Sequence, residues 1–167
     1  EGGRGQRLGP PHWPQYPSAG KVAAVADFNA EDAPRAVYLL GRLLAMDLKP
    51  LGINVNCAPV LDILRAETQN IIGDRALGND TSRVAYLGRA LCEGLLAGGV
   101  LPVIKHMPGH GRAYVDSHNY LPSVTVSAEE LKKSDFAPFR SLNDMPIAMT
   151  AHVVYTAYDV DHPVTTS

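Results

Sequence analysis

Apolar positions along the chain predict several amphipathic helices. Residues 31–49 and 81–97 both repeat apolar side chains at three- or four-residue spacing, which is typical of a helix with one buried face. Pro34 falls in the first turn of the first helix, where its missing N–H costs little, and Asp80 or Thr81 can cap the second. Ser127 and Glu130 have the spacing of a capping box, which predicts a short helix and then a further helical stretch to about residue 143.

Three mostly apolar runs, residues 53–63, 100–106 and 146–152, predict buried strands, separated by loops at 65–80 and 107–126. Residues 1–20 contain four prolines and are also expected to be a loop. Helices between the strands predict parallel pairing. Each strand ends in polar residues, and these are Asp62, Lys105 with His106, and His152. Polar side chains at the carboxyl ends of parallel strands are typical of an α/β active face.

The fold class expected from this order is α/β, a TIM (β/α)8-type barrel. A complete barrel of this kind takes about 250 residues, and the chain has 167. We therefore expect residues 1–167 to be an internal part of one barrel, with units missing at both ends.

Composition narrows the function classes. The chain has 15 Lys and Arg against 17 Asp and Glu, a net charge of −2, which does not favour nucleic-acid binding. The sequence shows neither a membrane span nor a signal peptide. Cys57 and Cys92 lie in apolar surroundings and are expected to be buried thiols, as in a reducing, cytoplasmic setting.

The most informative stretch is KHMPGHG, residues 105–111, followed by DSH at 116–118. Asp116 and His118 are two residues apart, so in an extended segment both point to one side. A carboxylate that accepts from one imidazole nitrogen orients the ring and leaves the other nitrogen free for general acid/base catalysis. Gly109 and Gly111 give this loop conformational freedom. The alternative for such a pair is a solvated contact in a loop.

Other roles are open for the neighbouring polar residues. A metal site could draw its ligands from His106, His110, Asp116 and His118. Pro108 and Gly109 argue against the helical metalloprotease arrangement. Lys105, at a strand end, is favoured as a buried donor that faces a ligand. Arg7 and Arg75 lie in glycine-containing loops, where each could equally be a surface arginine or part of an ion pair that braces its loop.

These strings resemble a known family. KHMPGHG, four residues, then DSH is similar to the signature KHFPGHG-x4-DSH of bacterial β-N-acetylglucosaminidases of glycoside hydrolase family 3, with Met107 as the departure. EGGRGQRL, APVLDI, IIGDRALG and AMTAHVVY resemble further segments of that family in the same order. The resemblance covers essentially the whole chain.

The resemblance implies specific roles. His118 would be the acid/base and Asp116 its carboxylate partner, whereas His110 and His152 would be structural. The residues expected to bind sugar hydroxyls are Arg7, Arg75, Lys105 and His106.

The function implied is retaining hydrolysis of terminal, non-reducing N-acetylglucosamine residues, as in the release of this sugar from muropeptides during cell-wall recycling in the bacterial cytoplasm. No cofactor is implied. The family's nucleophile is an aspartate in a Ser-Asp-Asp-type stretch that does not occur in this chain. A non-catalytic sugar-binding protein and a relative that transfers sugar to phosphate therefore stay open as alternatives.

Overall fold

The computed structural model describes residues 1–115 and 120–167. Its centre is a three-stranded parallel sheet in the order β1-β2-β4, formed by β1 (Val55–Asn56), β2 (Leu101–Met107) and β4 (Ile147–Thr150). Val55 lies opposite Leu101, and Val103 lies opposite Ile147. The predicted parallel pairing of the three runs is confirmed.

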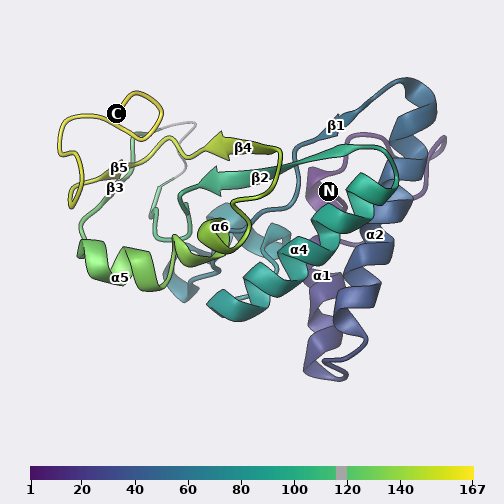
Figure 1. Cartoon of the computed structure of the whole chain (residues 1–167), viewed down its shortest axis with the longest axis horizontal. Coiled ribbons are helices and arrows are strands. Elements are labelled where there is room, and N and C mark those ends of the chain that lie inside the picture. The colour runs from purple at the N-terminus through teal and green to yellow at the C-terminus, as the bar shows by residue number, and fades with distance from the viewer. Residues whose placement is uncertain (116–119) are drawn as a thin grey trace.

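Two long helices pack beside this sheet. Helices α2 (Ala33–Leu48) and α4 (Thr81–Ala97) begin and end within two residues of the sequence prediction. The Asp80 carboxylate caps α4 by accepting the backbone N–H of Arg83 at 2.8 Å. In Figure 1, α4 lies beside β2, α2 packs against α4, and the short helix α6 (Ala137–Ser141) lies next to α4.

The main hydrophobic core fills the space between these helices and the sheet. Its members include Val37, Leu40 and Leu44 of α2, Leu87, Leu91 and Leu95 of α4, and Ile104 of β2. The two helices approach closely at Gly94, because a Cβ there would lie 2.2 Å from the carbonyl oxygen of Tyr38. The predicted helix stripes are therefore the faces that bury against each other and against the sheet.

Short helical elements lie in the loops expected at 1–20 and 65–80, and also in the unassigned stretch before the predicted helix 31–49 and at the end of that helix. At the N-terminal side these are η1 (Gly3–Gly5), α1 (Ala19–Ala23), η2 (Ala24–Asp27) and η3 (Lys49–Leu51). The region predicted as a polar loop at 65–80 contains η4 (Ala66–Thr68), α3 (Gln69–Ile72) and η5 (Gly73–Arg75). Single turns of this kind have no long apolar repeat, so the hydrophobic pattern does not indicate them.

A second, smaller core joins the far end of the chain to the loop after β2. Strands β3 (Ser123–Val124) and β5 (Val154–Tyr155) form a two-residue parallel pair that the sequence did not predict. Leu131 of α5 (Ala128–Lys133) is fully buried against them. Half of the predicted capping box is observed: the Ser127 hydroxyl accepts the backbone N–H of Glu130 at 3.2 Å, and the Glu130 carboxylate pairs with Arg112.

Several predicted elements are shorter than expected. Within 53–63 only β1 is regular, although the chain continues beside β2 through an isolated bridge between Val60 and Lys105. Pro59 has no N–H to add to the ladder. The helical stretch to 143 is broken into α5 and α6, because Ser134 leaves the helical conformation and Pro138 begins a new helix. The run 146–152 is regular only over β4.

The expectation of two buried thiols is half wrong. Cys92 in α4 is fully buried, but Cys57, just after β1, is exposed. Ile53 and Val55, earlier in the same apolar run, are exposed as well, and burial begins only at Ala58. Among the residues that the structure describes, no helix is both long and apolar enough to span a membrane.

Candidate active site

A buried carboxylate organises the carboxyl end of the sheet. Asp62 follows the β1 segment and is 0% exposed. Its Oδ2 lies 2.7 Å from Nδ1 of His106, and its Oδ1 accepts the backbone N–H groups of His110 at 2.7 Å and His106 at 3.2 Å. Burial alone would raise the pKa of Asp62, but the hydrogen bond and charge of His106 and the His110 N–H together lower the pKa below its ordinary value.

This carboxylate fixes the strand end. Because one Asp62 side chain binds both the ring and the backbone of His106, the imidazole has a defined orientation, and Nε2 is the ring nitrogen left for other contacts. The pairing of β2 with β4 also shifts register between Lys105 and Met107 at this point. Regular pairing of β2 with β4 is therefore interrupted at Lys105 and His106, where the polar residues of the site begin.

A second carboxylate, that of Glu1, binds two cationic side chains of the site. Glu1 accepts from Arg75 through Nη2 at 2.9 Å and from Lys105 Nζ at 3.1 Å. The Lys105 side chain is only 7% exposed, as the strand-end position predicted. Burial would raise the pKa of Glu1, but hydrogen bonding to Arg75 and the charges of Lys105 and Arg75 lower it. Glu1 is therefore an anion shared by two of the predicted sugar-binding residues.

The N-terminal segment also places the loop that carries Arg75. Arg4 Nη2 donates to the carbonyl oxygens of Ile72 at 2.7 Å and Ile71 at 3.0 Å. Gly73 has a φ of +61°, a conformation that favours glycine, and the Arg4 guanidinium packs where a Cβ would stand. The EGGR segment thus braces the Arg75 turn from two sides, through Glu1 and through Arg4.

These residues open onto one cavity of about 760 Å³. Its lining includes all four residues predicted to bind sugar, which are Arg7, Arg75, Lys105 and His106. Arg7 is exposed and has no hydrogen bond or ion pair to any other residue within 1–115 and 120–167. The cavity also contacts Glu1, Asn56 and Cys57. Several fixed N–H donors therefore converge on a space large enough for a sugar.

The remaining predicted residues divide into two groups. Asp116 and His118, the expected catalytic pair, lie outside the residues that the structure describes. His110 is buried, and its ring lies 5.7 Å from that of His106 between centroids. His152 is exposed and hydrogen-bonds Thr165 at 2.7 Å. In the described part of the chain, no three His, Cys, Asp or Glu side chains form a group that could hold a metal.

Sequence reasoning assigned no site role to Glu1, Asp62 or Cys57. Asp62 could have been found, because it was already one of the polar strand ends. Glu1 belongs to the same EGGR segment as Arg4, and its spacing gives no sign of the distant partners Arg75 and Lys105. Long-range ion pairs of this kind depend on the folded topology.

Comparison with known proteins agrees with this geometry. The profile of the Glycosyl hydrolase family 3 N terminal domain matches residues 1–167. A β-hexosaminidase of Alkalilimnicola ehrlichii is 38% identical over 161 residues, and one of Pseudomonas aeruginosa is 37% identical over 163. Each alignment covers 95% of this chain and 46% of the relative. The chain therefore spans about half the length of the curated relatives it matches.

Solved structures give the same result. NagZ from Neisseria gonorrhoeae in complex with N-trifluoroacetyl-D-glucosamine is 37% identical with a TM-score of 0.91, covering 97% of this chain and 48% of that one. A family 3 β-N-acetylglucosaminidase from Paenibacillus is 34% identical with a TM-score of 0.83, covering 90% and 28%. The predicted fold class is confirmed as TIM-barrel type, and the chain belongs to glycoside hydrolase family 3, whose N-terminal domain it matches along its whole length.

Proposed function

We propose that this chain is an internal part of the catalytic barrel of a β-N-acetylhexosaminidase that removes terminal, non-reducing N-acetylglucosamine by a retaining mechanism. The observation that carries the proposal is the convergence of Arg7, Arg75, Lys105 and His106 on one cavity at the carboxyl end of a parallel sheet. That position is where barrel enzymes of this type hold their substrates.

The cations of the cavity bind the sugar in this proposal. Lys105 and Arg75 are held by Glu1, so their N–H groups are oriented before a ligand arrives. His106 is oriented by Asp62. Arg7 lies at the cavity wall and has no hydrogen-bond partner within residues 1–115 and 120–167, so its donors are open to a ligand. Oriented donors that need no reorganisation bind hydroxyl groups with a smaller entropic loss than mobile ones.

The proton transfers belong to His118, with Asp116 as its carboxylate partner. His118 protonates the leaving oxygen in the first step, and in the second step it removes a proton from the attacking water. The nucleophile that forms the glycosyl-enzyme is a carboxylate supplied by another part of the complete protein. This chemistry moves protons and a glycosyl group only, so we propose that no metal or organic cofactor takes part.

The substrate class rests on the relatives. Curated relatives are named β-hexosaminidase, and the gonococcal structure holds an N-acylated glucosamine. From this likeness we propose N-acetylglucosamine-containing muropeptides as substrates, peptidoglycan recycling as the process and the bacterial cytoplasm as the location, with neither nucleic acid nor membrane as a partner.

Turnover of an aryl β-N-acetylglucosaminide by the complete gene product tests the proposal. His118→Ala should lower kcat about 10²–10⁴-fold, the usual loss when a general acid/base is removed. His162→Ala is the matched control, because His162 is exposed and also pairs with a carboxylate, with Nδ1 3.3 Å from Oδ2 of Asp159. An unaltered rate in His118→Ala would remove this histidine from the mechanism.

Two further results would replace the proposal. Sugar binding without any turnover by the complete protein would favour a non-catalytic sugar-binding protein. A rate that depends on added phosphate, with a sugar phosphate as the product, would identify a phosphate-using relative. Release of N-acetylglucosamine from purified muropeptides at a rate near that of the aryl substrate would support the cell-wall assignment.

A further inference from the structure

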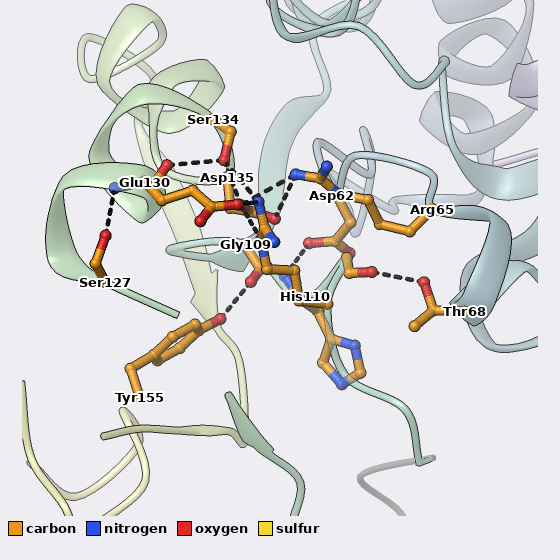
Figure 2. A network of polar contacts seen from close by, with 12 residues as sticks. Asp62, Arg65, Thr68, Gly109, His110, Ser127, Glu130, Ser134, Asp135 and Tyr155 are labelled. Atoms are coloured by element: carbon orange, nitrogen blue, oxygen red, sulfur yellow. Dashed lines mark hydrogen bonds and ion pairs between the residues drawn. The ribbon is translucent and has the colours of Figure 1, made fainter. Parts of the chain in front are cut away.

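We propose that Arg112 is a positioning residue that fixes the base of the loop carrying His118, by an ion pair to the buried carboxylate of Asp135. The proposal rests on the proposed function, because it assigns Arg112 an effect on proton transfer by His118. Its structural basis is a network of side chains from separate elements around residues 109–113, drawn in Figure 2.

Asp135 is the centre of this network. It follows α5 and is only 1% exposed. Its Oδ2 accepts from Nε of Arg112 at 2.7 Å and lies 3.2 Å from Nη2 of Arg65, and the Ser134 hydroxyl donates to it at 2.6 Å. Two arginines from different loops therefore share one buried carboxylate. Figure 2 labels Asp135 and Arg65 of this group. Arg112 extends further to Glu130, whose Oε1 lies 2.7 Å from Nη2.

The residues around Arg112 are also held, each by a different element. The Tyr155 hydroxyl of β5 donates to the Gly109 carbonyl oxygen, and Asp62 accepts the His110 N–H. The Thr68 hydroxyl of η4 donates to the Gly111 carbonyl oxygen at 2.6 Å. Ala113 is fully buried in the smaller core. The five residues 109–113 are thus each fixed, although the sequence contains two glycines there.

The backbone of residues 109–113 is also tightly enclosed, because two of its glycines have no room for a side chain. A Cβ at Gly111 would lie 2.2 Å from the carbonyl oxygen of Ile63, and one at Gly109 would lie 2.6 Å from that of Asp135. These glycines are required by close packing at their positions, and Gly109 also has a φ of +141°. The sequence reading of Gly109 and Gly111 as sources of loop freedom is therefore wrong for the residues themselves.

The returning end of the loop attaches to the same body. The carbonyl oxygen of Pro122 accepts the Val154 N–H at 2.9 Å, and that of Val124 accepts the Thr156 N–H at 3.1 Å. Val124 packs in the same small core as Ala113. Residues 109–113 and 122–124 are therefore both fixed to one unit, which is built from β3, β5 and the α5 region. Arg112 is the charged residue that attaches the first of these segments to that unit.

A buried ion pair is a weak source of stability, because desolvation of the charges offsets their attraction. An arginine fork held by several acceptors does give geometric definition. Proton transfer needs donor and acceptor at hydrogen-bond distance, and a displacement of about 1 Å can cost on the order of 100-fold in rate. Loss of the Arg112 link is therefore expected to affect the protonation step more than sugar binding.

Arg112→Met in the complete protein tests the inference. For an aryl N-acetylglucosaminide with a poor leaving group, kcat should fall about 10- to 100-fold while KM stays within about twofold. A substrate with a good leaving group needs less protonation, so its kcat should fall less. Arg112→Lys keeps one donor for Asp135 and should recover part of the loss. Hydrogen exchange of the amides in 109–113 should become faster in Arg112→Met.

Arg89→Met is the matched control, because it removes an arginine from an exposed ion pair on α4, with Asp144 2.8 Å away, and should leave both kcat values unchanged. Equal losses for both leaving groups, or a loss confined to KM, would overturn the positioning role. If Arg112→Met does not fold, the same comparison with Arg112→Lys decides the question. If the unaltered protein shows no turnover, the proposed function fails, and unchanged exchange in 109–113 would then separately refute the anchoring.

Discussion

Two regions of this molecule pair carboxylates with cations, and they differ in what those charges face. In the cavity, Glu1 joins Arg75 and Lys105 beside open space, and the Arg75 side chain is 22% exposed. Beneath the loop after β2, Asp62 and Asp135 are almost completely buried and face backbone amides, a histidine and arginines. The chemistry of the pairs is alike, but the Glu1 carboxylate lines the cavity, whereas the carboxylates of Asp62 and Asp135 are enclosed by protein groups.

This difference separates charged residues that face the cavity from charged residues that hold other protein groups in position. Donors at the cavity wall, such as the exposed Arg7, are not enclosed by protein groups, and in the proposed function they bind the substrate. The carboxylates of Asp62 and Asp135 use most of their hydrogen-bonding capacity on protein groups, so removal of either carboxylate leaves buried donors without a partner. Substitutions in the two regions should therefore have different effects. Those in the cavity should lower activity, and those of the buried carboxylates should lower the stability or change the geometry of the loop.

The largest expected effect is on stability. Asp62→Asn removes a buried charge that holds His106 and two backbone N–H groups, so the free energy of unfolding should fall by about 3 kcal/mol at pH 7. The folded pKa of Asp62 is lowered, so its ionisation stabilises the fold above the unfolded pKa of about 3.9, and this is lost as pH falls through the folded pKa. The deficit of the variant should therefore shrink in acid.

Denaturant unfolding at pH 7 and at about pH 3 measures this difference. Asp144→Asn is a suitable control, because Asp144 is exposed and pairs with Arg89 on α4. A loss for Asp62→Asn no larger than that of the control would show that the two regions do not differ as described.

A smaller effect is expected in the cavity. Lys105→Met should lower kcat/KM about 100-fold, through lost donors to the sugar, while changing the stability far less than Asp62→Asn does. The control is Lys49→Met, since Lys49 is exposed and donates to the Gly99 carbonyl oxygen at 3.0 Å, away from the cavity. Steady-state kinetics and unfolding of both variants check the prediction, and a stability loss without a kinetic one would contradict it.

The smallest effect concerns the two thiols. Cys57 lines the cavity, whereas burial raises the pKa of Cys92 to about 12. A thiol reagent should modify Cys57 of the native protein at least about tenfold faster than Cys92. Saturating N-acetylglucosamine should slow the reaction of Cys57 alone. Peptide mapping after timed labelling measures both rates, with Cys57→Ser as the control, and equal rates would place Cys57 outside the accessible cavity.

The sequence predicted most of what depends on local pattern. Helices α2 and α4 follow from apolar spacing, with Pro34 in the first turn of α2 and a cap at Asp80 for α4, and β2 follows from a buried run with a polar end. The four sugar-binding candidates come from the family resemblance, and the strand-end rule found Lys105 and His106 independently. Their convergence on one cavity is a structural finding, and their roles, like those of Asp116 and His118, stay predictions.

The rest depends on contacts between distant segments. Glu1 meets Arg75 and Lys105, and Arg112 meets Asp135, only after the chain has folded. The pair of β3 with β5 is two residues long, too short for a periodic signal. Cys57 is exposed together with Ile53 and Val55, and the apolar pattern does not show which part of a run other segments will cover.

The order β1-β2-β4 has a consequence for assembly. Only β2 has a neighbour on each side within the described sheet, so β1 and β4 carry outward rows of amide and carbonyl groups. Such borders invite pairing with any available strand. A closed ring of strands removes both borders together. Because Asn56 of β1 and Met149 of β4 both line the cavity, any strand that paired with either border would also extend the cavity wall.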